Sequence, residues 1–180
     1  MDTSEKMIAG ETVFHGRLVT VRRDTVAVPG GASAIREIVE HCAGAVILPV
    51  DERERCLLVR QFRYAFSREL LEAPAGKVEC GEAPEVCAAR ELSEETGFTA
   101  DELVYLGSAL PSPGYATEVV HVYLALGLHR GACHPDSDEH IRAEWYSLTD
   151  AVDMAADGRI TDAKTVIALL KAEKYLKKDR

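Results

Sequence analysis

Residues 76–98 read GKVECGEAPEVCAARELSEETGF, the most informative stretch of the 180-residue chain. Pro84 suits the first turn of a helix, and Gly97 suits the stop at its C-terminal end. Glu82 lies near the expected N-terminus, where a negative charge interacts favourably with the helix dipole. The stretch therefore predicts a helix that begins after Gly81 and ends at Gly97.

Three glutamates share one face of this predicted helix. At 100° per residue, Glu91, Glu94 and Glu95 stand at positions i, i+3 and i+4. Apolar positions fall on roughly the opposite side, and we expect the helix to bury these: Val86, Ala89 and Leu92. Like charges at this spacing repel, and a hard divalent cation bound by oxygen ligands is the natural partner. The alternative is a solvated acidic face, because acidic residues are usually exposed.

The spacing of residues 76–98 matches G-x5-E-x7-R-E-U-x-E-E-x-G-U at every specified position, where U is a bulky apolar residue. A chance match of this kind in such a chain is expected less than about once in a million. This pattern is the Nudix box, and residues 76–98 are called the box below. The chain therefore resembles the Nudix hydrolases. The resemblance implies an α+β (mixed α/β) Nudix fold, with a mixed β-sheet sandwiched between helices. It also implies hydrolysis, dependent on Mg²⁺ or Mn²⁺, of a nucleoside diphosphate linked to another group.

The resemblance also suggests roles for individual residues of the box. It implies that Glu91 and Glu95 bind the metal, usually with Glu94 and the main-chain carbonyl of Ala75. Glu82 is expected nearby as an outer-sphere metal partner or as a brace for Arg90. We count Arg90 and Glu94 among the predicted catalytic residues. Divalent cations suit this reaction because they neutralise phosphates and lower the pKa of bound water.

Two segments outside the box resemble the ADP-ribose pyrophosphatase subgroup. Residues 60–64 (RQFRY) and 69–76 (ELLEAPAG) look like the approach to the box in those enzymes, although Ala73 stands where leucine is common. A proline fifteen residues after the box, within Ser112-Pro113-Gly114, is also typical of the subgroup, and we assign these three residues to substrate binding. GDP-mannose hydrolases share parts of this pattern, and an ordinary turn would explain the prolines alone. The resemblance implies hydrolysis of ADP-ribose, with other ADP-sugars as further candidate substrates, to AMP and ribose 5-phosphate. The alternative is a Nudix hydrolase of another nucleotide sugar such as GDP-mannose.

Arginines outside the box are further candidates for substrate binding. By resemblance we place Arg63 on the substrate diphosphate, since a guanidinium can hold a phosphate bidentately. In this subgroup the N-terminal strands pack or swap across a dimer, and an Arg-Glu pair helps hold the adenine in the partner's site. Arg36 and Glu37 match that pair, although an exposed strand pair is the alternative. We expect residues 1–40 to form an antiparallel dimerisation region and residues 41–180 to form the Nudix hydrolase domain of a homodimer.

The general base is expected outside the box. The resemblance implies a glutamate on a flexible loop before a late strand, and the polar segment 129–140 is the candidate loop. Its carboxylates are Asp136, Asp138 and Glu139. We choose Glu139, which stands two residues before the expected strand at Ile141, with Asp138 or a glutamate of the box as the alternative.

The rest of the chain predicts mixed α and β structure. Residues 43–50 form a nearly continuous apolar run, which is typical of a strand buried on both faces. Further strands are expected at 13–21, 24–28, 34–41, 56–62, 103–110, 119–128 and 141–148. Two further helices are expected at 149–156 and 161–174.

Composition narrows the class of protein. Apolar residues make up 47%, and 21 basic against 30 acidic residues give a net charge of −9, which argues against a general nucleic-acid binder. Five cysteines without a C-x-x-C pattern predict reduced thiols in a cytoplasmic protein. No apolar run approaches the roughly 18 residues of a membrane span, so we expect no membrane partner. A non-hydrolysing ADP-ribose-binding module is the rival from another class, but such modules usually lose carboxylates that this chain keeps.

Overall fold

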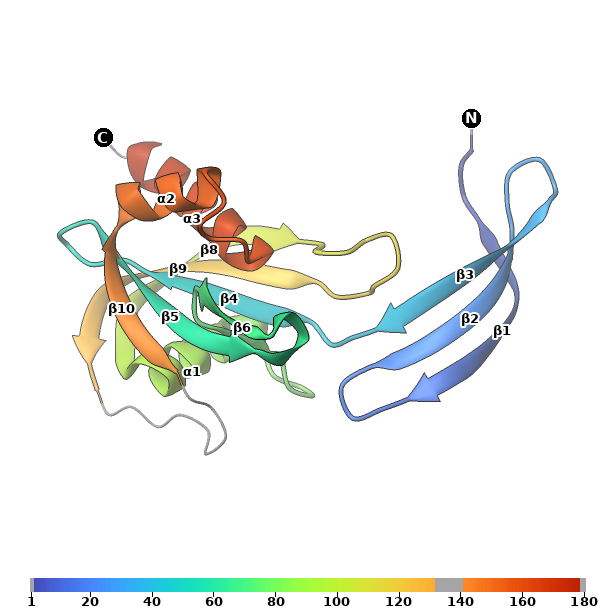
Figure 1. Ribbon diagram of the computed structural model, residues 1–180, viewed down its shortest axis with the longest axis horizontal. Helices are drawn as coiled ribbons and strands as arrows, with labels where there is room; N and C mark the ends of the chain where they lie inside the picture. Colours follow the sequence, from blue (N-terminus) through green and yellow to red (C-terminus); the bar gives the residue numbers. More distant parts are fainter. Residues whose placement is uncertain (1, 132–140, 179–180) are drawn as a thin grey trace. The chain divides into compact units, whose positions relative to one another are not determined.

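The computed structural model describes residues 2–131 and 141–178, which divide into two compact units (Figure 1). The first unit comprises Met1–Cys42 and Leu110–Val119, and the second comprises Ala43–Ala109 and Val120–Arg180. The segment 110–119, which the sequence did not associate with the N-terminal region, joins the first unit through backbone hydrogen bonds. The Val39 N–H donates to the Tyr115 carbonyl at 2.8 Å, and the Thr117 N–H donates to the Val39 carbonyl at 3.0 Å.

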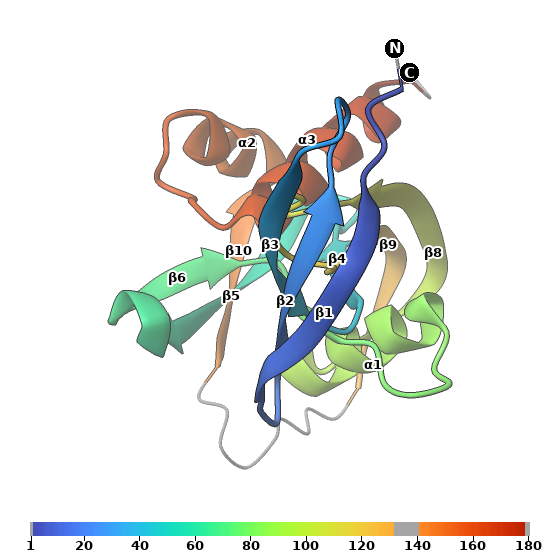
Figure 2. The ribbon, with the colours of Figure 1, turned by 90° about the vertical axis from the view of Figure 1, so that its right-hand side faces the viewer.

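The first unit is built on an antiparallel three-stranded sheet in the order β1-β2-β3 (Figure 2). The strands are β1 Lys6–His15, β2 Thr20–Ala27 and β3 Ser33–Glu40. The prediction of one strand over residues 13–21 is wrong, because the chain turns after β1 and the Gly16 N–H donates to the Val19 carbonyl at 2.9 Å. The break between β2 and β3 is confirmed, with Gly30 and Gly31 in left-handed conformations that favour glycine.

The second unit contains a mixed four-stranded sheet in the order β7-β4-β9-β8. Its strands are β4 Gly44–Pro49, β7 Ala75–Lys77, β8 Phe98–Ala109 and β9 Val120–Arg130. β4 pairs with β9 in parallel and with β7 antiparallel. Every residue of β4 is buried, as the apolar run predicted.

Helices cover both faces of this sheet, as Figure 1 shows around β4 and β9. The helices are α1 Pro84–Thr96, α2 Leu148–Ala156 and α3 Ala163–Lys178. Ile47 of β4 points to the face where Leu92 of α1 packs, and its neighbour Leu48 points to the face where Leu169 of α3 packs. The predicted sheet between helices is therefore confirmed. Among the described residues, no helix is long and apolar enough to cross a membrane.

A second, three-stranded sheet of the same unit has the order β10-β5-β6. Its strands are β5 Arg55–Arg63, β6 Arg68–Glu72 and β10 Arg142–Ser147, and the 3-10 turn η1 Tyr64–Phe66 joins β5 to β6. β6 and β7 were not predicted, because they are short and lack a clear alternation of apolar and polar residues. These two strands nevertheless carry the chain from the end of β5 to Gly76, the first residue of the box.

Candidate active site

Helix α1 positions the acidic residues of the box. Pro84 is in its first turn, and Gly97 ends it in the left-handed conformation (φ 71°), with its N–H donating to the Ser93 carbonyl at 2.9 Å. Both ends are as predicted from the sequence.

The face that α1 buries differs from the predicted one. Val86 is 58% exposed and Ala89 is also exposed, whereas Glu91 and Glu95 are only 9% and 6% exposed. Of the predicted apolar face, only Leu92 is buried. Helical spacing determines which residues share a face, but the neighbouring strand determines which face packs against the protein. Here two carboxylates turn inward with Cys87, Ala88 and Leu92.

Gly76 makes room for one of these carboxylates. It lies on β7 opposite Ala45 of β4, and a Cβ atom built on it would overlap the Oε1 and Cδ atoms of Glu91 and lie 2.7 Å from Oε2. Any side chain at position 76 would therefore displace Glu91. Ala75, whose carbonyl the sequence predicts as a metal ligand, is the preceding residue of the same short strand.

The donor atoms at this place suit a hard cation. Burying a carboxylate without a compensating charge is costly, and oxygen atoms are the ligands that Mg²⁺ and similar ions use. Within residues 2–131 and 141–178, no three acidic, histidine or cysteine side chains already converge on one point. A guanidinium lies among the carboxylates instead.

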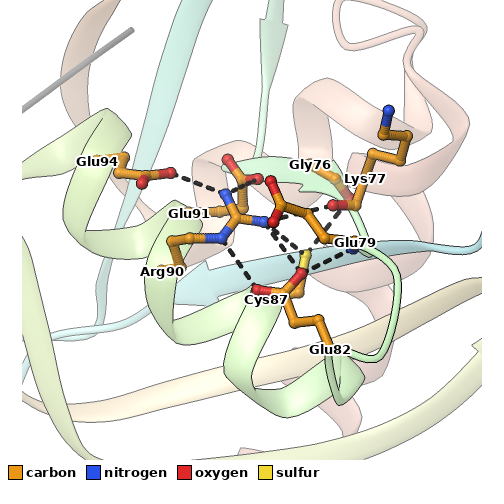
Figure 3. A network of polar contacts seen from close by, with 8 residues as sticks. All are labelled: Gly76, Lys77, Glu79, Glu82, Cys87, Arg90, Glu91 and Glu94. Atoms are coloured by element: carbon orange, nitrogen blue, oxygen red, sulfur yellow. Dashed lines mark hydrogen bonds and ion pairs between the residues drawn. The ribbon is translucent and has the colours of Figure 1, made fainter. Parts of the chain in front are cut away.

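That guanidinium belongs to Arg90 and binds three glutamates at once (Figure 3). Its Nε donates to Glu82 at 3.0 Å, and its Nη1 donates to Glu91 at 2.7 Å and to Glu94 at 2.9 Å. The hydrogen bond to Glu82 is the largest cause that raises the pKa of Arg90, and the same bond lowers the pKa of Glu82. The proximity of Glu82 to Arg90, which the resemblance implied, is thus present.

Arg63 lies at the end of β5 and is held by a residue that the sequence analysis did not single out. Its Nε donates to Oε1 of Glu72 at 2.7 Å, and its Nη2 donates to Oε2 at 2.8 Å. Hydrogen bonding to Glu72 is the main cause that raises the pKa of Arg63, and the negative charge of Glu95 is a smaller cause. Glu72 stands between Leu71 and Ala73, and a single acidic residue inside an otherwise apolar segment was the available signal.

The other predicted substrate-binding residues belong to the first unit. Arg36 donates to Glu5 at 2.9 Å, and Glu37 is exposed. Ser112, Pro113 and Gly114 form a turn in which the Ser112 carbonyl accepts the N–H of Ala116 at 2.9 Å. The structure therefore brings together the box residues and places Arg63 in the same unit, while the Arg36–Glu37 pair and residues 112–114 share the other unit.

The predicted general base cannot be placed in this site. Glu139 and its alternative Asp138, together with Asp136, lie outside the described residues. The strand expected after them is β10, which begins at Arg142.

Comparisons with known proteins agree on one family. The model of the NUDIX domain matches residues 40–169. The chain is 39% identical over 167 residues to an ADP-ribose pyrophosphatase of Bacillus subtilis and 38% identical over 167 residues to a methanol dehydrogenase activator of Bacillus methanolicus. Each of these alignments covers 92% of this chain and 90% of the relative. A solved structure described as an ADP compounds hydrolase superposes with a TM-score of 0.88 at 24% identity, covering 97% of this chain and 95% of the other.

Proposed function

The chain belongs to the Nudix family, and on that premise we propose that it hydrolyses the pyrophosphate bond of ADP-ribose to give AMP and ribose 5-phosphate. The observation that carries the proposal is the complete box, with Glu91 and Glu95 turned inward and Gly76 leaving space for the Glu91 carboxylate. The substrate rests on the likeness to a pyrophosphatase of that name across nearly the whole chain.

The metal in this proposal is Mg²⁺ or Mn²⁺. The residues that would hold it are Glu91, Glu95, Glu94 and the Ala75 carbonyl, with Glu82 as an outer-sphere partner or as a brace for Arg90. When bound, such an ion neutralises phosphate charge and lowers the pKa of water. Arg90 pairs with Glu91 and Glu94 of α1 and with Glu82 just before the helix, so its positive charge offsets the mutual repulsion of these three carboxylates.

The proposal keeps the substrate contacts that the resemblance implied. Arg63 holds the diphosphate, Arg36 and Glu37 help hold the adenine in the partner's site across a dimer, and residues 112–114 bind substrate. Glu139 accepts the proton of the attacking water. The water oxygen then forms a bond to one phosphorus, and the bond from that phosphorus to the bridging oxygen breaks.

A cytoplasmic homodimer completes the proposal. All ten residues of β1 are exposed, and the first unit leaves large apolar side chains in solvent, including Met7 at 66% and Ile8 at 61%. Exposed apolar surface of this kind marks interaction sites. Light scattering after gel filtration should therefore give twice the chain mass. A fully active monomer at micromolar concentration would rule out the role of Arg36 and Glu37 across a dimer.

A substrate panel tests the function. Hydrolysis of ADP-ribose, ADP-glucose, GDP-mannose and 8-oxo-dGTP should be measured with Mg²⁺ and compared by kcat/KM. We expect ADP-ribose to be among the best substrates. A preference for GDP-mannose would favour the alternative nucleotide sugar, and binding of ADP-ribose without turnover would favour the non-hydrolysing module.

A further inference from the structure

The contact between Arg63 and Glu72 uses one particular edge of the guanidinium. Both hydrogen bonds leave from the side edge, Nε and Nη2, and end on the two oxygens of one carboxylate. A guanidinium has five N–H donors in a fixed plane. The end edge, formed by Nη1 and the second N–H of Nη2, therefore remains for another bidentate acceptor such as a phosphate.

Glu72 has a second cationic partner in the first turn of α3. Its carboxylate is 2% exposed, and Nζ of Lys164 lies 3.4 Å from its Oε2. The same Lys164 donates to Asp162 at 2.6 Å. The carboxylate thus pairs with a cation on β5 and with a cation on α3, which limits its freedom to move.

The main chain beside Glu72 is tied to the same helical turn. The Ala73 N–H donates to the hydroxyl oxygen of Thr165 at 2.7 Å, and that hydroxyl donates to Asp162 at 2.7 Å. Thr165 is fully buried. Ala73 stands two residues before Ala75, so the network connects the start of α3 to the segment that leads into the proposed metal site.

We propose that Glu72 is the positioning residue of Arg63. It binds the side edge of the guanidinium so that the end edge faces the substrate diphosphate, and Lys164 keeps Glu72 in place. This inference rests on the proposed function, because the diphosphate is the group that Arg63 would hold. Arg63 has a side chain 38% exposed, so without Glu72 it would have several rotamers available and would have to be ordered when substrate binds.

Glu72→Gln should therefore weaken substrate binding more than the chemical step. We expect KM for ADP-ribose to rise about tenfold to hundredfold with kcat changed less than about threefold, as for loss of a contact made equally in the ground and transition states. Glu144→Gln is the matched control, since Glu144 binds both Nε and Nη2 of Arg60 on the same strand β5. This control should leave KM within about twofold of the wild type.

A double-mutant cycle separates positioning from a general structural role. If Glu72 acts through Arg63, adding Glu72→Gln to Arg63→Ala should change kcat/KM by less than about twofold. Losses that multiply in the double variant would overturn the inference. If Glu72→Gln does not fold, Glu72→Asp serves in the same cycle, because it keeps the charge and withdraws the carboxylate by one methylene. A wild-type chain that does not hydrolyse ADP-ribose would overturn the proposed function and this inference together, whereas multiplying losses in an active wild type would overturn this inference alone.

Discussion

Replacing Gly76 with alanine is the sharpest test of the acidic site. The added methyl group would occupy the place of the Glu91 carboxylate. The two groups overlap, so the carboxylate would have to move away. Moving it breaks the 2.7 Å bond between Arg90 and Glu91. The backbone at Gly76 does not have a positive φ, so alanine causes no conformational strain of its own there.

The size of the effect follows from this overlap. Inserting a methyl group into a packed site costs about 1–3 kcal/mol of unfolding free energy. For a chain of this size, each kcal/mol lowers Tm by about 2–4 °C, so a total loss of roughly 2–12 °C is expected. A shift of about 1 Å in the carboxylate of Glu91, a proposed metal ligand, should lower kcat on the order of a hundredfold.

The assay combines calorimetric Tm with Mg²⁺-dependent hydrolysis of ADP-ribose. The double variant Gly76→Ala/Glu91→Ala is the control, because shortening the glutamate removes the atoms that the new methyl group meets. In the Glu91→Ala background, Gly76→Ala should therefore lose most of its effect on Tm. An undiminished loss of Tm in that background would refute the proposed overlap.

Further predictions address ligation, packing, the base and the thiols. Glu95→Gln should strongly lower kcat while the protein still folds, because it removes the charge of a proposed metal ligand. Unchanged activity at limiting Mg²⁺ would contradict the ligand role. Leu92→Ala should lower the unfolding free energy in urea by about 2–5 kcal/mol, since Leu92 is 1% exposed between α1 and the sheet. Glu139→Gln should lower kcat by about 10²–10⁴-fold with little effect on ADP-ribose binding, and a loss below about tenfold would transfer the role to Asp138 or to the box. Burial raises the pKa of Cys56 and of Cys87 to about 12, so at pH 8 iodoacetamide should label the exposed Cys42 and Cys80 first, as peptide mass mapping would show.

Local patterns in the sequence determined much of the second unit. Pro84 and Gly97 define the ends of α1 because their backbone preferences act within a few residues. The apolar run of β4 predicted burial on both faces for the same reason. The box spacing identified the family, because so many specified residues at fixed distances along the chain rarely match by chance.

The tertiary structure decided which partners these residues meet. Helical spacing grouped Glu91, Glu94 and Glu95, but only the approach of β7 at Gly76 shows that Glu91 and Glu95 face inward while Val86 faces solvent. Glu72 pairs with Arg63, which is 9 positions away in the sequence, and with Lys164, which is 92 positions away. No local pattern encodes such a contact, because it forms only when β6 and the start of α3 pack together and a buried carboxylate requires cations beside it.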